Sequence, residues 1–163
     1  MILEHPIGSL ADAAYSGRPV DWLEIEWFNN AKRIDRRRTA SGVEVGLRLD
    51  HETCHRGLRT GDVLYASEES VIAVRILPCE ALVLCPETPA QTVKACYELG
   101  NHHAPFFYGE HEGEFLTPYD APLHRLLDKL GIPARRDAAV LDPARAISST
   151  TGHGGHHHHH HDE

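Results

Sequence analysis

The histidines are the side chains of this sequence best suited to chemistry. The chain has 163 residues and 14 histidines, and seven of these lie within the last eleven residues. They are His153, His156, His157, His158, His159, His160 and His161. Neutral imidazoles on a leader rich in glycine, serine and threonine can surround a borderline metal ion, for which Ni(II), Cu(II) and Zn(II) are the natural candidates. A purification tag would look the same. Both origins stay open, and a metal-binding tail is predicted in either case.

A pair of adjacent histidines, His102 and His103, follows Gly100 and Asn101. In an extended chain adjacent side chains point to opposite sides, so we expect at most one of the two to serve a given site directly. An ordinary solvated loop histidine is the alternative. One imidazole is too few ligands for a stable metal site. A ligand here therefore needs a second donor, or a symmetric partner across a two-fold axis.

The other histidines carry weaker predictions. His111 lies between two glutamates in a predicted hairpin, where it could capture an ion, although a solvated turn is the favoured interpretation. His124 is expected to be a surface or partly buried residue. His51 and His55 are four residues apart, which suits a metal pair on a helix. The segment before Gly57 is predicted to be a loop, however, so little weight falls on that pair.

A basic cluster between Lys32 and Arg38 holds five of the 16 basic residues. The chain as a whole has a formal charge of -8, whereas nucleic-acid binders normally carry a basic excess. An acidic protein partner that contacts Arg36, Arg37 and Arg38 is at least as good an account as DNA or RNA, which the overall charge disfavours. A solvated strand end is the alternative.

The sequence lacks the usual signals of hydrolases, nucleotide-binding enzymes and exported proteins. It has no GxSxG motif and no glycine-rich phosphate loop, so we do not expect an enzyme. No apolar run reaches the length of a membrane span, and the first ten residues do not resemble a secretion signal. Four cysteines, spaced by 25, 6 and 11 residues, match neither a zinc pair nor a disulfide framework. A cytoplasmic protein with reduced thiols is predicted.

The scaffold that positions these side chains is predicted to be of α+β class. Up to residue 77, short apolar runs alternate with turn signals, which predicts a small all-β domain over residues 1–77. We expect this domain to bind a protein or peptide. Its expected strands are Trp22 to Phe28, Val43 to Leu49, Val63 to Tyr65 and Val71 to Leu77.

From residue 78 two helices interrupt the strands. Thr88 is a suitable cap for the first helix, which has an apolar face of Val93, Cys96 and Tyr97 and a predicted stop at Gly100. The second helix fits residues 120–130. With strands at 80–85, 104–108, 114–117 and 135–141, residues 78–147 are predicted to form a ferredoxin-like β-α-β-β-α-β domain. Residues 148–163 form the predicted flexible tail.

The combination of a small β domain, a ferredoxin-like domain and a histidine-rich tail resembles the UreE family of urease accessory proteins. The family motif is typically Gly-Asn-Arg-His, then a hydrophobic residue and proline, and residues 100–105 here read Gly-Asn-His-His-Ala-Pro. The family's metal-binding histidine therefore falls on His103, while His102 stands where arginine is usual. The resemblance covers most of residues 20–131, including a basic strand and Ser-Gly turn at 36–49 and Leu-Arg-Thr-Gly-Asp at 58–62.

This resemblance implies a nickel metallochaperone that delivers Ni(II) to apo-urease with an accessory GTPase. It implies a homodimer in which two His103 side chains share a metal. The residues alone do not rank Ni(II) above Zn(II) or Cu(II), either of which could also bind in vitro. Some members carry extra histidines before the second helix; these are missing here, and His111 is the candidate substitute. Two other functions stay open: a metal storage or buffering protein that uses the tail, and a nucleic-acid-binding module that uses Arg36 to Arg38.

Overall fold

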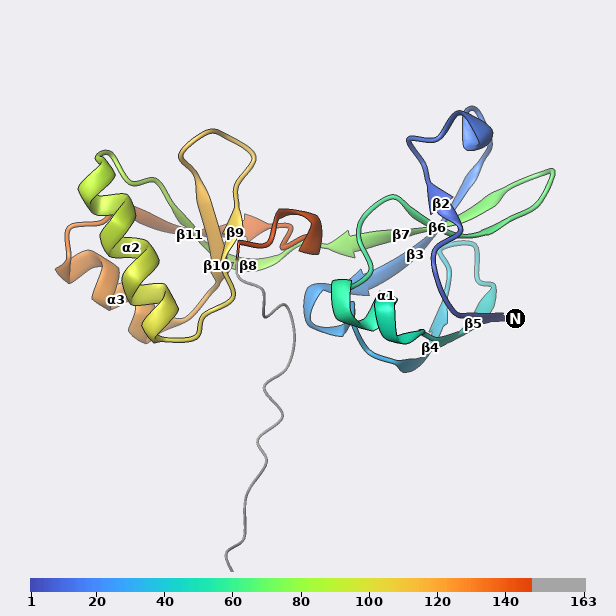
Figure 1. Ribbon diagram of the computed structural model, residues 1–163, viewed down its shortest axis with the longest axis horizontal. Helices are drawn as coiled ribbons and strands as arrows, with labels where there is room; N and C mark the ends of the chain where they lie inside the picture. The colour runs from blue at the N-terminus through green and yellow to red at the C-terminus, as the bar shows by residue number, and fades with distance from the viewer. Residues whose placement is uncertain (148–163) are drawn as a thin grey trace, which may run out of the picture.

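The computed structural model describes residues 1–147, so the predicted tail at 148–163 lies outside the described residues. The described chain forms two neighbouring units, and a single residue, Pro78, separates the last strand of the first unit from the first strand of the second (Figure 1). Several sheets and few helices make up these units, which confirms the predicted α+β class. No helix within residues 1–147 is long and apolar enough to cross a membrane.

The N-terminal unit contains two sheets with one core between them. The first sheet has the order β2-β6-β7-β3 and the second has the order β1-β5-β4. Alternate apolar side chains of facing strands, including Leu23, Val45 and Val74, form the core. The strands are β1 (Ile2–Leu3), β2 (Gly8–Ser9), β3 (Val20–Glu26), β4 (Ile34–Arg38), β5 (Glu44–Arg48), β6 (Asp62–Ala66) and β7 (Val71–Leu77), and the short 3-10 helices are η1 (Ala13–Tyr15) and η2 (Trp27–Asn29).

The prediction of a loop before Gly57 is wrong, because this segment forms helix α1 (His51–Arg56). The Asp50 side chain accepts a hydrogen bond from the Thr53 N–H at 2.7 Å, which caps the first turn. Gly57 ends the helix with a φ of 72°, and its N–H donates to the Thr53 carbonyl. Six residues are too few for a repeating apolar pattern. Only the two caps therefore signal this helix in the sequence.

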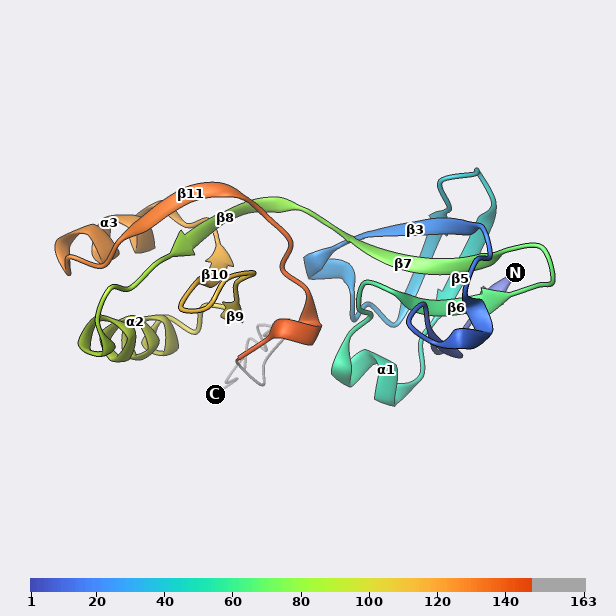
Figure 2. The ribbon, with the colours of Figure 1, turned by 90° about the horizontal axis from the view of Figure 1, so that it is seen from above.

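The C-terminal unit is one antiparallel sheet of order β11-β8-β10-β9. Two helices cover one face of it (Figure 2), where Leu99 and Leu127 pack with Leu82 and Leu84 of the sheet. The elements in chain order are β8 (Cys79–Leu84), α2 (Pro89–Asn101), β9 (Phe107–Tyr108), β10 (Phe115–Pro118), α3 (Ala121–Lys129), β11 (Ala134–Ala139) and the 3-10 helix η3 (Pro143–Arg145).

Helix α2 does not pack against the sheet with the apolar face that the sequence suggests. Ala95 and Leu99 are buried against the sheet, whereas Val93, Cys96 and Tyr97 are exposed. The helix carries apolar residues on both faces, so periodicity alone cannot tell which face packs. An apolar stripe of Val93, Cys96 and Tyr97 is thus left on the surface of the described chain.

In the contact between the two units, side chains of each unit pack against residues of the other. Trp27 of the N-terminal unit packs edge-on against Phe107 of the other, with ring centroids 6.5 Å apart. Val140, just after β11, packs against the core of the N-terminal unit. The Thr60 N–H also donates to the Asp142 carboxylate at 2.9 Å. These contacts bring η2 of the first unit close to β9 of the second.

Candidate metal centre

His103 lies just after α2 in the left-handed backbone conformation. Its φ of 50° makes it the one non-glycine residue with positive φ in the described chain. The His103 N–H donates to the Gly100 carbonyl and the Ala104 N–H to the Leu99 carbonyl, both at 3.0 Å. This pair of bonds is the Schellman motif, whose left-handed position is usually a glycine. The predicted stop at Gly100 is therefore wrong, because the helix continues to Asn101 and the reversal falls on His103.

A side chain at this position has to be explained by something other than packing. The left-handed conformation costs an L-residue roughly 1–2 kcal/mol, although histidine tolerates it better than most residues. The His103 side chain is exposed, so burial does not offset the cost. Backbone strain of this kind is concentrated at functional sites. The observation favours a functional imidazole at His103.

His102 occupies the residue before this reversal, at the C-terminal cap of α2. Its Nδ1 lies 2.8 Å from the Glu98 carbonyl oxygen. A carbonyl oxygen only accepts, so in the neutral imidazole this contact puts the proton on Nδ1 and leaves on Nε2 the lone pair that a metal ion needs. The expectation that His102 and His103 lie in extended chain is wrong. Both follow a helix, and both line one cavity.

That cavity has a volume of about 420 Å³ and draws residues from three parts of the chain. Besides the two histidines it is lined by Trp27 of the N-terminal unit and by Thr117 and Asp120 near the start of α3. The Thr117 hydroxyl oxygen is buried without a hydrogen-bond partner among the described residues. The described part of the chain contains no group of three or more His, Cys, Asp or Glu side chains arranged to hold a metal. The cavity is thus an incomplete ligand set.

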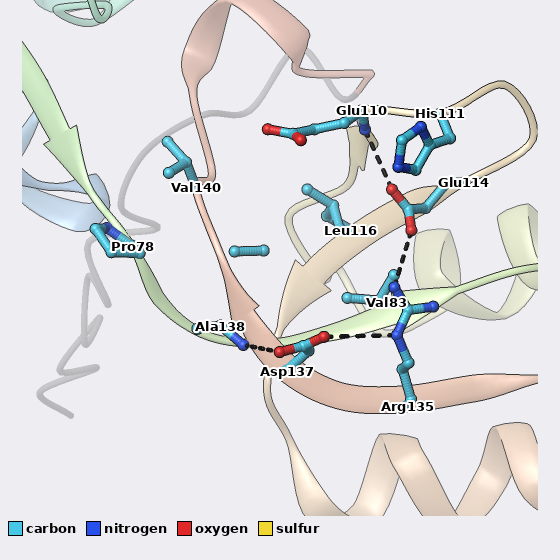
Figure 3. Close-up of a pocket in the computed structure, with 11 residues that line it drawn as sticks. Pro78, Val83, Glu110, His111, Glu114, Leu116, Arg135, Asp137, Ala138 and Val140 are labelled. Atoms are coloured by element: carbon cyan, nitrogen blue, oxygen red, sulfur yellow. Dashed lines mark hydrogen bonds and ion pairs between the residues drawn. The ribbon is translucent and has the colours of Figure 1, made fainter.

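His111 lines a separate pocket of about 240 Å³ between the β9–β10 hairpin and β11 (Figure 3). The Glu114 carboxylate there is already engaged, because it accepts hydrogen bonds from the Glu110 N–H at 3.2 Å and from Arg135 at 3.1 Å. Arg135 also lies 3.6 Å from a carboxylate oxygen of Asp137. A divalent ion beside His111 would compete with the arginine for these carboxylates. The pocket shares no lining residue with the cavity of His103.

The arginine cluster splits into two faces of β4. Arg36 and Arg38 are exposed and both pair with Glu44 of β5, at 3.1 and 2.8 Å. Arg37 is mostly covered and pairs with Asp35 at 2.8 Å and Glu26 at 2.7 Å. Burial acts to raise the pKa of Asp35, but hydrogen bonds from Arg37 and its positive charge hold that pKa below its usual value. Arg37 therefore serves the fold, while Arg36 and Arg38 face solvent.

The remaining histidines divide between the described chain and the tail. His124 is partly buried, as predicted, with Nε2 3.3 Å from the Ala134 carbonyl oxygen. His51 and His55 are exposed on α1. The predicted tail ligands lie outside the described residues; they are His153, His156, His157, His158, His159, His160 and His161.

Comparison with known proteins gives matches over both units. The family described as "UreE urease accessory protein, N-terminal domain" matches residues 3–77, and the corresponding C-terminal domain matches residues 69–163. The urease accessory protein UreE of Helicobacter pylori strain G27 is 37% identical over 153 residues, which are 94% of this chain and 89% of the relative. The proteins of the same name from Helicobacter acinonychis and Helicobacter bizzozeronii are 36% and 34% identical over 153 residues, again 94% of this chain and 89% and 86% of the relatives.

Proposed function

Because the chain belongs to the UreE family of urease accessory proteins, we propose that it is a metallochaperone that delivers Ni(II) during assembly of the urease active site. A role in urease assembly follows from the family, and nickel is the proposed cargo. One observation carries the proposal. An exposed imidazole, His103, is held in a strained backbone conformation beside an open cavity.

An incomplete ligand set suits delivery better than storage in a fixed site. A complete shell of four protein ligands would close the site and slow the release of the ion. The cavity offers His103, the free Nε2 of His102 and the carboxylate of Asp120 on its wall. Intrinsic affinity favours Cu(II) over Ni(II), and Zn(II) also accepts imidazole, so nickel selectivity would come from the supply in the cell.

A second copy of the chain is the proposed source of the missing ligand. The exposed stripe of Val93, Cys96 and Tyr97 lies on α2, the helix that ends at His103. A contiguous apolar patch of this kind is typical of an interaction surface. A two-fold axis near the end of α2 would place two His103 imidazoles on one ion. The stripe therefore supports a homodimer with a shared metal.

The position of the last described residues, Ala146 and Ile147, supports the proposal that tail histidines supply further ligands to the cavity. The Ile147 N–H donates to the Phe106 carbonyl at 2.8 Å, and Ala146 bridges to Phe107. The last described residue is thus tied to the strand that follows His103. His153 is six residues beyond Ile147, a span of at most about 20 Å of extended chain. A tether this short keeps the proposed tail ligands at high effective concentration near the cavity.

The proposed partners are apo-urease and the accessory GTPase of urease assembly, in the cytoplasm. Arg36 and Arg38 are the proposed contacts for an acidic partner, with Arg37 holding their strand in place. We assign residues 1–77 to an interaction domain, 78–147 to a ferredoxin-like domain and 148–163 to the histidine-rich tail. The element order and the strand order β11-β8-β10-β9 support the ferredoxin-like assignment.

Calorimetric nickel titration of the chain ended after Thr151 tests the proposal. Relative to the full chain, this protein should lose most bound nickel but keep about one tightly bound ion per dimer. The His103→Ala variant should lose that ion, and His102→Ala should weaken it less, with thermal melts as a control for folding. Equal losses in both variants, or none in either, would overturn the assignment of His103. A shortened chain without a tight nickel site would favour storage in the tail.

A further inference from the structure

Helix α1 carries a second arrangement of metal-binding side chains, far along the sequence from His103. Residues 51–55 read His-Glu-Thr-Cys-His, the spacing in which two histidines on one helix bind a metal ion. The structure places His51 and His55 on the same helix, in its first and fifth positions. Residues four apart are neighbours on a helix surface, with Cβ atoms about 5–6 Å apart. The pair therefore has the spacing of a two-imidazole chelate.

The rest of the helix fixes the direction of this pair. Thr53 is buried and the Cys54 thiol lies 3.7 Å from the Leu49 carbonyl oxygen, so this side of α1 faces the core. Residues 51 and 55 are each about 160° around the helix from residue 53, and both histidines are exposed. The two caps at Asp50 and Gly57 hold the backbone of the short helix. Both imidazoles are thus presented to solvent on an ordered element.

The local charges allow a cation at this surface. The partial positive charge of a helix N-terminus opposes a cation near its first turn, but the carboxylates of Asp50 and Glu52 lie in or beside that turn. The positive charge of Arg56 is paired with Asp62 at 2.9 Å. The carboxylates of Asp50 and Glu52 therefore offset the electrostatic repulsion between the helix N-terminus and a metal ion near His51.

A hydrolytic zinc site with this spacing needs a third protein ligand. In residues 1–147 no third His, Cys, Asp or Glu joins the pair in an arrangement that could hold a metal. The remaining coordination positions would be filled by water, and the ion would exchange easily. The geometry indicates reversible capture and gives no basis for proteolysis.

We infer that His51 and His55 form an auxiliary metal site on the N-terminal unit, which binds a borderline divalent ion such as Ni(II), Cu(II) or Zn(II). This site does not depend on the cavity of His103, on a second copy of the chain or on the tail. It gives the N-terminal unit a metal-binding capacity of its own.

Titration of the full, isotope-labelled chain with Cu(II) tests this inference, because the paramagnetic ion broadens only nearby amide signals in NMR spectra. Glycine as a competing chelator sets the free Cu(II) concentration. The amides of residues 50–57 should broaden in the parent chain. His51→Gln and His55→Gln should each weaken this local binding by about 100-fold or more, since one imidazole alone loses the chelate. The double variant, which has no imidazole on α1, should bind no more tightly than either single variant.

The matched control is His5→Gln, which removes another exposed histidine near Asp50 and should leave the broadening of α1 unchanged. Helical signals in the circular dichroism spectrum report whether each variant keeps its fold. Unbroadened signals in the parent chain, or equal broadening in either single variant, would overturn the inference. Broadening around residues 102–105 in the same spectra reports on the cavity of His103, so failure of one site is distinguishable from failure of the other.

Discussion

At His103 the backbone and the side chain have opposite requirements. The left-handed conformation favours glycine, whereas a metal ion needs the imidazole. We predict that His103→Gly raises the free energy of unfolding by about 0.5–1 kcal/mol relative to His103→Ala, because alanine keeps the strain. Both variants should lose the tight nickel site. Urea denaturation and calorimetry measure the two effects, and a less stable glycine variant would show that the Schellman geometry is not relevant to stability.

Arg37 differs from its neighbours because its side chain is mostly covered and pairs with two carboxylates, those of Asp35 and Glu26. We predict that Arg37→Gln costs about 1–3 kcal/mol at neutral pH, since Asp35 and Glu26 lose a charged partner. The matched change Arg36→Gln, at an exposed position, should cost less than about 0.5 kcal/mol. Urea denaturation curves of both variants provide the comparison.

The same ion pairs predict how stability depends on pH. Burial acts to raise the pKa values of Asp35 and Glu26, but their hydrogen bonds, including those from Arg37, keep both below the usual values. A depressed carboxyl pKa stabilises the fold above the unfolded value and loses this contribution as pH falls through the folded value. The parent chain should therefore lose stability as pH falls from about 5 to about 3, and Arg37→Gln should lose less. An equal slope in both would contradict this role of Arg37.

The sequence identifies His102 and His103 as candidate metal ligands, but it does not predict how their backbone and side chains are arranged. Gly100 is the natural candidate for the helix stop, yet the left-handed position is three residues later and is held by His103. Left-handed histidine is rare enough that sequence alone does not suggest it. The sequence therefore predicts that the two side chains diverge in an extended chain, whereas both histidines line one cavity.

Among the elements, α2 makes the clearest prediction about association. Val93 is 70% exposed on α2, and Ile34 on β4 is 69% exposed. If the α2 stripe is the dimer surface, Val93→Glu should weaken dimerisation at least about 10-fold, because a charge would be buried on association. The matched Ile34→Glu should not change it. Sedimentation velocity measures both, and equal effects would place the interface elsewhere.

Element prediction succeeded where periodic patterns are long and failed where they are short. Strand β7 has the predicted bounds Val71–Leu77, and α3 (Ala121–Lys129) lies within the predicted range 120–130. The six residues of α1 and the two-residue strands β1 and β2 have no room for a pattern. The loop predicted in place of α1 is also the reason why the four-residue spacing of His51 and His55 carries little weight in the sequence analysis.

For the whole molecule, the position of Trp27 links the two units to the proposed metal cavity. Trp27 contacts Phe107 and lines the cavity of His103, while Trp22 is covered by Arg75, 4.1 Å from its ring centroid. We predict that Ni(II) quenches tryptophan fluorescence in a Trp22→Phe variant but much less in Trp27→Phe. Adding His103→Ala to the first variant should remove most of the quenching. Quenching that persists would mean that the ion binds near Trp27 without His103.

No pattern in the sequence predicts the contacts between the two units. Trp27 and Phe107, and Thr60 and Asp142, are about 80 residues apart in the chain, and a single sequence contains no signal for such pairings. Local patterns were sufficient for the β-α-β-β-α-β order of the second unit. Local patterns did not predict that Trp27 of the first unit forms part of the cavity wall.

The exchange of side chains between the units has a consequence for cooperativity. Val140 completes the core of the N-terminal unit and Trp27 packs against that of the C-terminal unit, while one residue joins β7 to β8. If either unit melted, the other would lose part of its apolar packing at once. We therefore expect heat to unfold the described chain in a single transition, with calorimetric and van't Hoff enthalpies that agree. Two separate transitions would show that each unit is stable without the packing of Val140 or Trp27 from the other unit.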